Sequence, residues 1–442
     1  MPRQSAPALL LDPTFPYGED LFQFIWQQGL FDHHALRTTD GRTVEVVKAG
    51  RIQVDSGPDL MDAQVRIDGQ LWAGTVEVHL RSSDWNTHGH ERDPAYDSVV
   101  LHVVFEHDAE VRMRNGASPP TVELHSRVSS DSISLYRSLM RGQGFVPCAS
   151  QIAHVDKARI GPWLERVLVE RLQRKAREVE ALYDKLDLDP AETLYHMIAR
   201  AFGLKVNAEP FGMLAHALPL KIIQKYRDDA LRTEALLFGQ AGLLQVDFVE
   251  AYPRELQREH ALLARLHGLH PAPVAAWKFN RMRPLNFPTV RIAQFAQLLM
   301  RCDGDLGVLL STDNVKELFD RLNAEASAYW MTHYRFDSQN AARPKRLGRA
   351  GAQHLIINAI VPVLFALGRA QGREEMGERA LRLLEQLPAE RNQLLASWAH
   401  AGLVADTAAR GQALVELKNL YCAQRRCLSC AIGNQLLRST VK

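Results

Sequence analysis

The chain has 442 residues, of which 46% are hydrophobic and 24% charged, and its formal net charge is +2. This length is about three times that of a common domain, so two or three domains are expected, and the composition excludes a disordered or fibrous chain. The balance of 53 basic against 51 acidic residues excludes a globally basic, histone-like protein, so any nucleic-acid site has to be local.

The ends and the apolar runs of the chain bear on its location. The N-terminal residues MPRQSAPALLLDPTFPYGED contain only a short apolar run and lack the layout of a signal peptide. The longest apolar stretch, residues 354–368, contains Asn358 and Pro362 and is shorter than a membrane span. We therefore expect a cytoplasmic protein without a membrane partner, whose oligomeric state the sequence leaves open.

The first 150 residues combine one predicted helix with a series of predicted strands. Residues 19–31 place apolar side chains at helical spacing. Runs rich in β-branched residues, separated by turn-forming residues, predict strands over 43–50, 60–67, 71–81, 98–107 and 121–128. The first three strands are expected to pair as hairpins, and the polar stretch before the fourth is long enough for a short helix.

Beyond about residue 155 the strand patterns give way to long amphipathic helical patterns. The sequence therefore predicts an α+β protein with two domains. Residues 1–150 are expected to form an α/β domain with a mixed sheet, and residues 151–442 a large all-helical domain that ends in a cysteine-rich motif. No fixed-period repeat supports a solenoid.

Two of the predicted strands carry ionisable side chains where burial is expected. Asp59 stands at the start of one strand, and Glu77 and His79 alternate with apolar residues on the next, so Glu77 and His79 share a face. In a hairpin the two carboxylates approach each other, and such a pair suits Mg²⁺, which prefers carboxylate, water and phosphate oxygens. The alternative is a solvated sheet face with cross-strand ion pairs.

A histidine-rich loop follows these strands. His88 and His90 are two residues apart, and His102 lies on the next predicted strand. These histidines could assemble a Zn²⁺ site together with Glu77 or His79. The alternative is a polar loop that covers the sheet or contacts a substrate phosphate.

In order and context, Pro58-Asp59 and Glu77-Val78-His79 resemble the motif of the PD-(D/E)xK nuclease superfamily. That superfamily has an αβββαβ core and a motif of Pro-Asp, a variable gap and Asp/Glu-x-Lys. The resemblance implies a restriction-endonuclease-like domain in which Asp59 and Glu77 bind Mg²⁺ and catalyse phosphodiester hydrolysis with His79. Histidine replaces lysine here and supplies no fixed positive charge at pH 7. His79 would then be a general base, a metal ligand or a sign of lost activity.

Three of the five cysteines, Cys422, Cys427 and Cys430, lie within nine residues. In a chain that is not expected to be secreted, such clustering favours a metal or redox site over disulfides. Cys148 is the candidate fourth ligand, which leaves Cys302 as an ordinary buried thiol. Four thiolates fit Zn²⁺ or an iron–sulfur cluster, and some nucleases of the superfamily named above carry a cluster with a similar outline of cysteines. The alternative is free thiols that pack a C-terminal helix.

Basic residues alternate with aromatic residues between positions 275 and 294 of the helical part. Such a pattern can hold phosphates and stack bases of DNA or RNA. The alternative is ordinary solvated charge on helix faces and loops. The predicted nucleic-acid contacts are Lys278, Arg281, Arg283 and Arg291.

Over nearly its full length the sequence is similar to a bacterial family called domain of unknown function 2851, through stretches such as GPDLMDAQVRI, EALLFGQAGLL and YCAQRRCLSCAIG. That family name implies no activity, so the functional prediction comes from the residues and from the nuclease resemblance: a metal-dependent hydrolase of nucleic-acid phosphodiester bonds. The alternatives are a non-catalytic nucleic-acid-binding protein with a degenerate nuclease fold and a scaffold protein with a structural metal site. A zinc hydrolase that uses His88 and His90 has less support.

Overall fold

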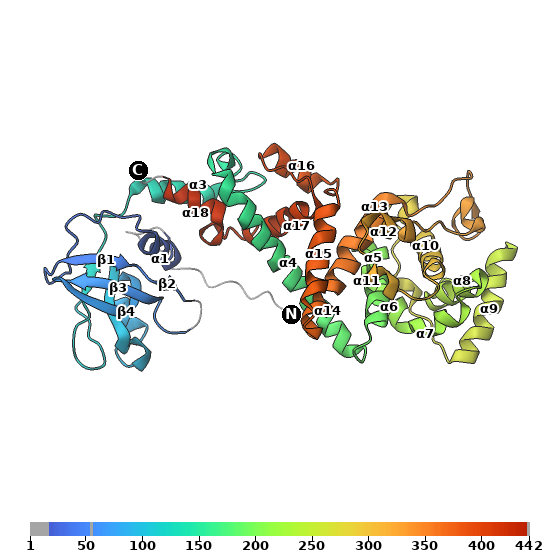
Figure 1. The fold of residues 1–442 in the computed structure, drawn as a ribbon, viewed down its shortest axis with the longest axis horizontal. Helices are drawn as coiled ribbons and strands as arrows, with labels where there is room; N and C mark the ends of the chain where they lie inside the picture. The colour runs from blue at the N-terminus through green and yellow to red at the C-terminus, as the bar shows by residue number, and fades with distance from the viewer. Residues whose placement is uncertain (1–16, 54–55, 440–442) are drawn as a thin grey trace. The chain divides into compact units, whose positions relative to one another are not determined.

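The computed structural model describes residues 17–53 and 56–439 and has an α+β architecture, with a mixed sheet in the N-terminal region and helices after it (Figure 1). The chain divides into two compact units: Met1–Trp163 together with Lys418–Lys442, and Leu164–Leu417. The C-terminal cysteine segment therefore belongs to the same unit as the sheet. The sequence prediction had grouped that segment with the helices of residues 151–442.

Six strands form the sheet of the first unit: β1 (Val44–Lys48), β2 (Arg51–Ile52), β3 (Leu60–Ile67), β4 (Gln70–Arg81), β5 (Val99–Glu106) and β6 (Thr121–Glu123). Their order is β1-β3-β4-β5-β6, with β2 paired to β3. β1, β3 and β4 are antiparallel, whereas β5 and β6 run parallel to β4, so the sheet is mixed. Asp68 and Gly69 have φ angles of 46° and 81°, which suits the tight turn between β3 and β4. The strand predicted over 121–128 ends at Glu123, because a turn begins at Leu124.

The first unit also contains four α-helices among its described residues: α1 (Glu19–Gln28), α2 (Asp84–Thr87), α3 (Ser130–Arg141) and α18 (Ala431–Arg438). α1 buries its apolar face, ends at Gly29 with a φ of 64° and packs against β4. α2 lies in the polar stretch between the third and fourth predicted strands and also packs against β4. Its Trp85 is buried in a cluster with Tyr96, Val99 and Val111. The loop is thereby fixed on the sheet by an apolar anchor.

Both faces of the central part of β4 are buried, because helices and the anchored loop pack around this strand. Glu77 is 3% exposed and His79 is 1% exposed. The alternative prediction, in which these side chains lie on a solvated sheet face, is therefore wrong. Burial of a carboxylate and an imidazole is costly unless other groups or an ion compensate for the lost water.

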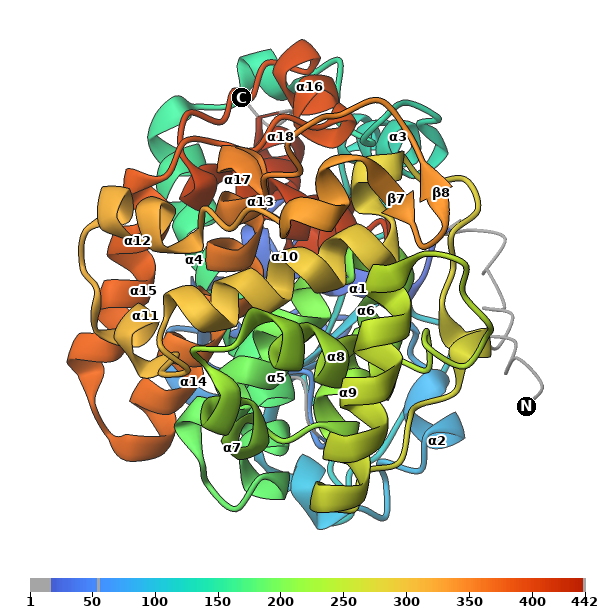
Figure 2. The same ribbon diagram turned by 90° about the vertical axis from the view of Figure 1, so that its right-hand side faces the viewer.

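The second unit is helical apart from a small hairpin of β7 (His333–Arg335) and β8 (Ser338–Gln339). α10 crosses this unit beside α8, as Figure 2 shows. The long helix α4 (Lys157–Lys185) begins in the first unit and continues into the second. The other α-helices are α5 (Pro190–Phe202), α6 (Leu204–Ala217), α7 (Leu220–Ile223), α8 (Ala230–Gln240), α9 (Ala251–His267), α10 (Pro288–Arg301), α11 (Gly307–Ser311), α12 (Val315–Leu322), α13 (Gly348–Leu355), α14 (Val361–Gln371), α15 (Glu374–Gln386), α16 (Gln393–His400) and α17 (Ala408–Glu416).

One stretch of the helical unit is long and apolar enough to cross a membrane. Within the described part of the chain it runs from Gly348 to Gln371, and 72% of its apolar window is buried inside the protein. A core helix passes the same test, so this feature is weak evidence for a span. The stretch includes a π-helical turn at Ile356–Ile360 between α13 and α14.

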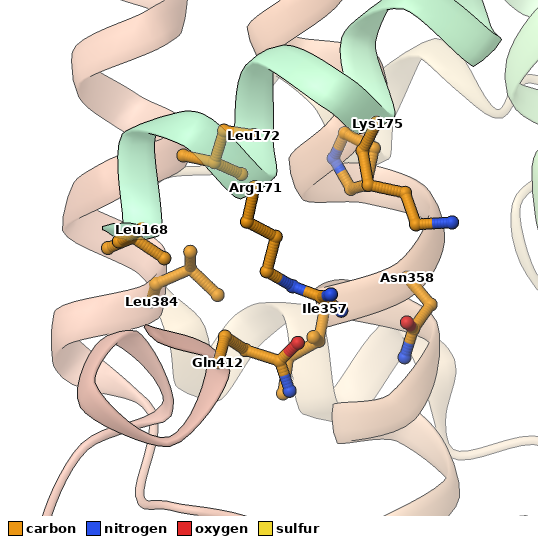
Figure 3. Close-up of a pocket in the computed structure, with 9 residues that line it drawn as sticks. Leu168, Arg171, Leu172, Lys175, Ile357, Asn358, Leu384 and Gln412 are labelled. Carbon is orange, nitrogen blue, oxygen red and sulfur yellow. The ribbon is translucent and has the colours of Figure 1, made fainter. Parts of the chain in front are cut away.

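A small hollow lies beside this π-helical turn (Figure 3). The Arg171 side chain extends from α4 into it, between Asn358 and Gln412. Arg171 and Arg174 both donate to the carboxylate of Glu416, whose side chain is fully buried. The positive charges at this hollow are therefore paired within the helical unit, which gives the ion-pair network a structural role.

Candidate metal centre

The start of β3 and the middle of β4 bring the two predicted carboxylates together. Leu60 pairs with Val76 across the two strands, so Asp59 lies beside Glu77. The backbone N–H of Asp59 donates to Glu77 Oε2 at 3.0 Å, and the backbone N–H of Val78 donates to Asp59 Oδ2 at 3.0 Å. The hairpin thus holds the two acidic residues in direct contact.

A further acidic residue, Glu19, lies near enough to this pair and to Asp84 for their charges to act on it. Burial and the negative charge of Glu77 raise the pKa of Asp59 to about 7, although Gln23 donates a hydrogen bond to it. Burial and the charges of Asp59, Asp84 and Glu77 raise the pKa of Glu19 to about 7. Carboxylates that repel one another in a partly buried cluster are typical of a cation site.

Sequence reasoning did not single out Glu19. It occupies the first turn of α1, where an acidic residue is favoured by the helix dipole alone. Only the packing of α1 against β4 gives this carboxylate a place near the other two. From the sequence, Glu19 therefore could not be distinguished from an acidic residue that only stabilises the start of a helix.

Two histidines lie directly against Glu77, and a third contacts one of them. His79 Nε2 is 3.4 Å from Glu77 Oε1, and His90 Nε2 is 3.1 Å from the same oxygen. His88 Nδ1 is 3.1 Å from His79 Nε2. His79 and His90 are buried, whereas His88 is exposed. The cluster therefore opens to solvent on the side of His88.

The loop conformation explains why His88 and His90 both reach β4. Gly89 between them has a φ of 77°, a left-handed conformation that glycine adopts without strain. The His90 ring then stacks on Tyr96 with ring centroids 3.7 Å apart, and Trp85 packs edge-on against His90. The aromatic anchor of the loop thus also fixes a histidine of the cluster.

The distances within the cluster fit a single bound ion. Ligand atoms held 2.0–2.1 Å from a tetrahedral ion are separated by about 3.3 Å. Three of the separations in the cluster are between 3.1 and 3.4 Å, and one ring nitrogen from each of His79, His88 and His90 lies within 4.8 Å of the others. His90 Nε2 has no hydrogen-bond partner among the described residues, although Glu77 Oε1 is near. Two atoms that face each other without a hydrogen bond are arranged as two ligands of one ion would be.

The donor set bears on which ion fits. One carboxylate oxygen with three imidazole nitrogens suits Zn²⁺ and other transition-metal ions, whereas Mg²⁺ prefers oxygen ligands throughout. Asp59 supplies a second carboxylate beside this set through its contact with Glu77. The structure therefore joins the predicted carboxylate pair and the alternative histidine site in one cluster.

His102, on β5, orients His79 from behind. Its Nε2 lies 3.0 Å from His79 Nδ1, and both rings are almost fully buried. Burial, followed by the neighbouring histidines, holds the pKa of His79 well below its usual range and lowers that of His102 to about 3. A neutral His79 can offer Nε2 to a metal while its Nδ1–H donates to His102, the pattern usual for metal-bound histidines.

The predicted basic stretch lies in the second unit. Lys278, Arg281 and Arg283 are exposed. Lys278 and Arg335 line an open pocket together with Trp277, Phe279, Val206 and Asn280. The Arg335 guanidinium lies over the ring of Phe279 at 4.7 Å from its centroid. This pocket combines two cations with aromatic rings, which is the combination that binds phosphates and unstacked bases.

Arg291 is placed differently from the other three predicted contacts. Its guanidinium donates to the side chains of Gln294 and Asn286 within the helical unit. Burial lowers its pKa to about 10. We therefore leave Arg291 out of the candidate nucleic-acid surface and add Arg335 to it.

The four predicted cysteine ligands also come together, in the first unit. Cys148, Cys422, Cys427 and Cys430 line one hollow, and all are free thiols. Burial raises the pKa of Cys148 to about 12 and that of Cys427 to about 11, and the neighbouring thiols add to both shifts. Cys302 is buried at the end of α10 in the second unit, away from this group.

Comparison with known proteins identifies the family of the chain. No curated protein and no solved structure gives a significant match. A family model described as "Protein of unknown function (DUF2851)" matches residues 19–393, which is well over half of the chain. The stretches on which the sequence resembled this family include β3, β4 and the histidine loop, where the candidate metal centre lies. The chain therefore belongs to the DUF2851 family.

Proposed function

We propose that this protein is a metal-dependent phosphodiesterase that acts on nucleic acid, with its active site at Asp59, Glu77 and the histidine cluster. The observation that carries the proposal is the position of Glu77 Oε1, 3.4 Å from His79 and 3.1 Å from His90, next to Asp59. The order of elements supports it: apart from the two-residue strand β2, the order α1, β1, β3, β4, the four-residue α2 and β5 follows the αβββαβ order of PD-(D/E)xK nucleases.

The metal is proposed to bind to Glu77, His79, His88 and His90, with Asp59 beside them. A divalent ion in such a site polarises a phosphate and lowers the pKa of an attacking water. The nitrogen-rich donor set leads us to propose Zn²⁺ ahead of the Mg²⁺ that the carboxylate pair alone suggested.

Asp59 and His79 have different roles in the proposed reaction. Asp59, beside the proposed metal ligands, is placed to accept a proton from the attacking water. His79 is neutral because it is buried among other histidines, so it does not replace the lysine charge of the nuclease motif. It is proposed to serve as a ligand held in place by His102.

A phosphodiester substrate is favoured by the surroundings of the site and by the second unit. The exposed ring of His88 marks the open side of the cluster. The pocket of Lys278, Phe279 and Arg335 offers cations and an aromatic ring on which a base can stack. We propose that this pocket binds a single-stranded part of DNA or RNA.

The test is cleavage of end-labelled single- and double-stranded DNA and RNA by metal-depleted protein that has been resupplied with Zn²⁺, Mn²⁺ or Mg²⁺. We expect cleavage with Zn²⁺. Glu77→Gln and Asp59→Asn should each reduce the rate by about 100-fold or more, because each removes a charge that stabilises the transition state.

Asp62→Asn is the matched control. Asp62 lies three residues from Asp59, pairs with Arg51 on the surface and has a φ of 57°, a conformation that asparagine tolerates. This variant should cleave as the unmodified protein does. Cleavage that persists in Glu77→Gln would assign the activity elsewhere, and salt-dependent binding without cleavage would favour the non-catalytic alternative.

A further inference from the structure

Four thiols from two distant parts of the sequence surround one hollow of the first unit. Cys148 follows α3, and Cys422, Cys427 and Cys430 precede α18. The hollow is partly open to solvent. Cys148, Cys427 and Cys430 are buried, and Cys422 is partly buried. No disulfide joins them, so four potential ligands face one space.

The backbone around Cys430 is shaped to receive a thiolate. The N–H groups of Ile432 and Gly433 both donate to its sulfur. Gly433 is needed for this approach, because a Cβ there would lie 2.3 Å from the carbonyl oxygen of Cys427. N–H donors on one sulfur are typical of metal-bound thiolates, whose charge they stabilise.

Side-chain contacts hold the two cysteine segments together independently of the thiols. Arg425 donates to the carbonyl oxygens of Leu139 and Gly142 near the end of α3. Lys418 donates to the carbonyl oxygen of Phe145 and lies over the ring of that residue. The hollow is therefore framed by polar contacts and does not depend on the sulfurs for its shape.

The spacing of the sulfurs distinguishes between a single ion and a cluster. Four thiolates on one tetrahedral Zn²⁺, each about 2.3 Å from the metal, would be about 3.8 Å apart. Within the described chain, only His79, His88 and His90 bring three candidate ligand atoms within 4.8 Å of one another, so no three of the four sulfurs are that close. A cluster has this wider spacing, because its thiolates bind different irons.

We propose that Cys148, Cys422, Cys427 and Cys430 bind an iron–sulfur cluster that fastens the C-terminal segment to the unit that contains the sheet. The proposal does not depend on the proposed hydrolytic function, because the histidine cluster and the cysteine hollow share no residue. It predicts that the cluster adds to the polar contacts of Lys418 and Arg425, so loss of the cluster should loosen the segment from Lys418 onward.

The test uses the full chain purified without oxygen, and if necessary reconstituted with ferrous iron and sulfide. We expect a brown protein with broad visible absorption and with iron and acid-labile sulfide in equal amounts. Cys148→Ser should lose the colour, the iron and the sulfide. Cys302→Ser is the matched control and should keep them, because Cys302 is equally buried but lies in the second unit.

A second measurement covers the case in which Cys148→Ser does not fold. In the unmodified protein the four cysteines should resist alkylation until the iron is removed by oxidation and chelation, and mass spectrometry then identifies the thiols released. A colourless protein with one tightly bound zinc ion, or a protein that takes up no iron on reconstitution, would overturn the proposal. Loss of the iron from the Cys302→Ser variant would also overturn it. Cleavage by Glu77→Gln and its controls is a separate readout, so either proposal can fail alone.

Discussion

His102 offers the sharpest test of the metal centre, because it contacts no proposed ligand atom and yet positions one. In His102→Phe the aromatic volume is kept and the nitrogen 3.0 Å from His79 Nδ1 is lost. Both rings are at most 1% exposed, so water cannot easily replace the missing partner. Loss of such an orienting partner typically lowers metal affinity 10–100-fold, which corresponds to about 1.4–2.8 kcal/mol.

The assay is competition for Zn²⁺ between the metal-depleted protein and a chromophoric chelator. His102→Gln keeps an oxygen that can accept from His79 Nδ1–H, so it should recover part of the affinity. His125→Phe is the control, because His125 is exposed and contacts the ring of Phe105, away from the proposed ligands. If His102→Phe folds cooperatively and binds Zn²⁺ within about twofold of the unmodified protein, the assignment of His79 as a ligand oriented by His102 is refuted.

Two further predictions concern the helical unit. Glu416→Ala should lower the free energy of unfolding by about 3–5 kcal/mol in chemical denaturation, because it leaves Arg171 buried without its partner. Glu178→Ala removes a half-exposed partner of Arg174 and should cost less than about 1 kcal/mol, and equal losses would contradict the argument. Burial raises the pKa of Glu234, so the folded protein holds a proton that the unfolded chain releases, and stability should fall as pH rises from about 4.3 to that raised value. Glu234→Gln cannot titrate, so its free energy of unfolding should depend less on pH in the same assay. If the free energy of unfolding falls equally with pH in both proteins, Glu234 is not the cause.

The histidine in place of lysine takes on a different meaning once its neighbours are known. A lysine beside Asp59 and Glu77 would supply a fixed charge, whereas His79 is neutral and lies among three other imidazoles. Lost catalytic function would not require His79 and His90 to converge on the same carboxylate oxygen of Glu77. Their convergence favours a changed metal preference over a decayed active site.

Much of the first unit could be predicted from the sequence. The alternation of β-branched residues gave β3 and β4 nearly residue by residue, because strand periodicity is a local property. Asp59 and Glu77 could be chosen as partners because a tight Asp68–Gly69 turn permits only a hairpin between their strands. The cysteine spacing likewise indicated a ligand set before the hollow was known.

The tertiary structure decided what these residues surround. Glu19 and Tyr96 joined the site only through the packing of α1 and of the histidine loop on β4, and such contacts between distant segments leave no periodic trace in a sequence. Arg291 looked like its exposed neighbours but is engaged inside the helical unit, because a basic pattern does not show which side of a helix is covered. The choice between one ion and a cluster at the cysteines likewise rests on the distances between sulfurs, which the folded chain alone determines.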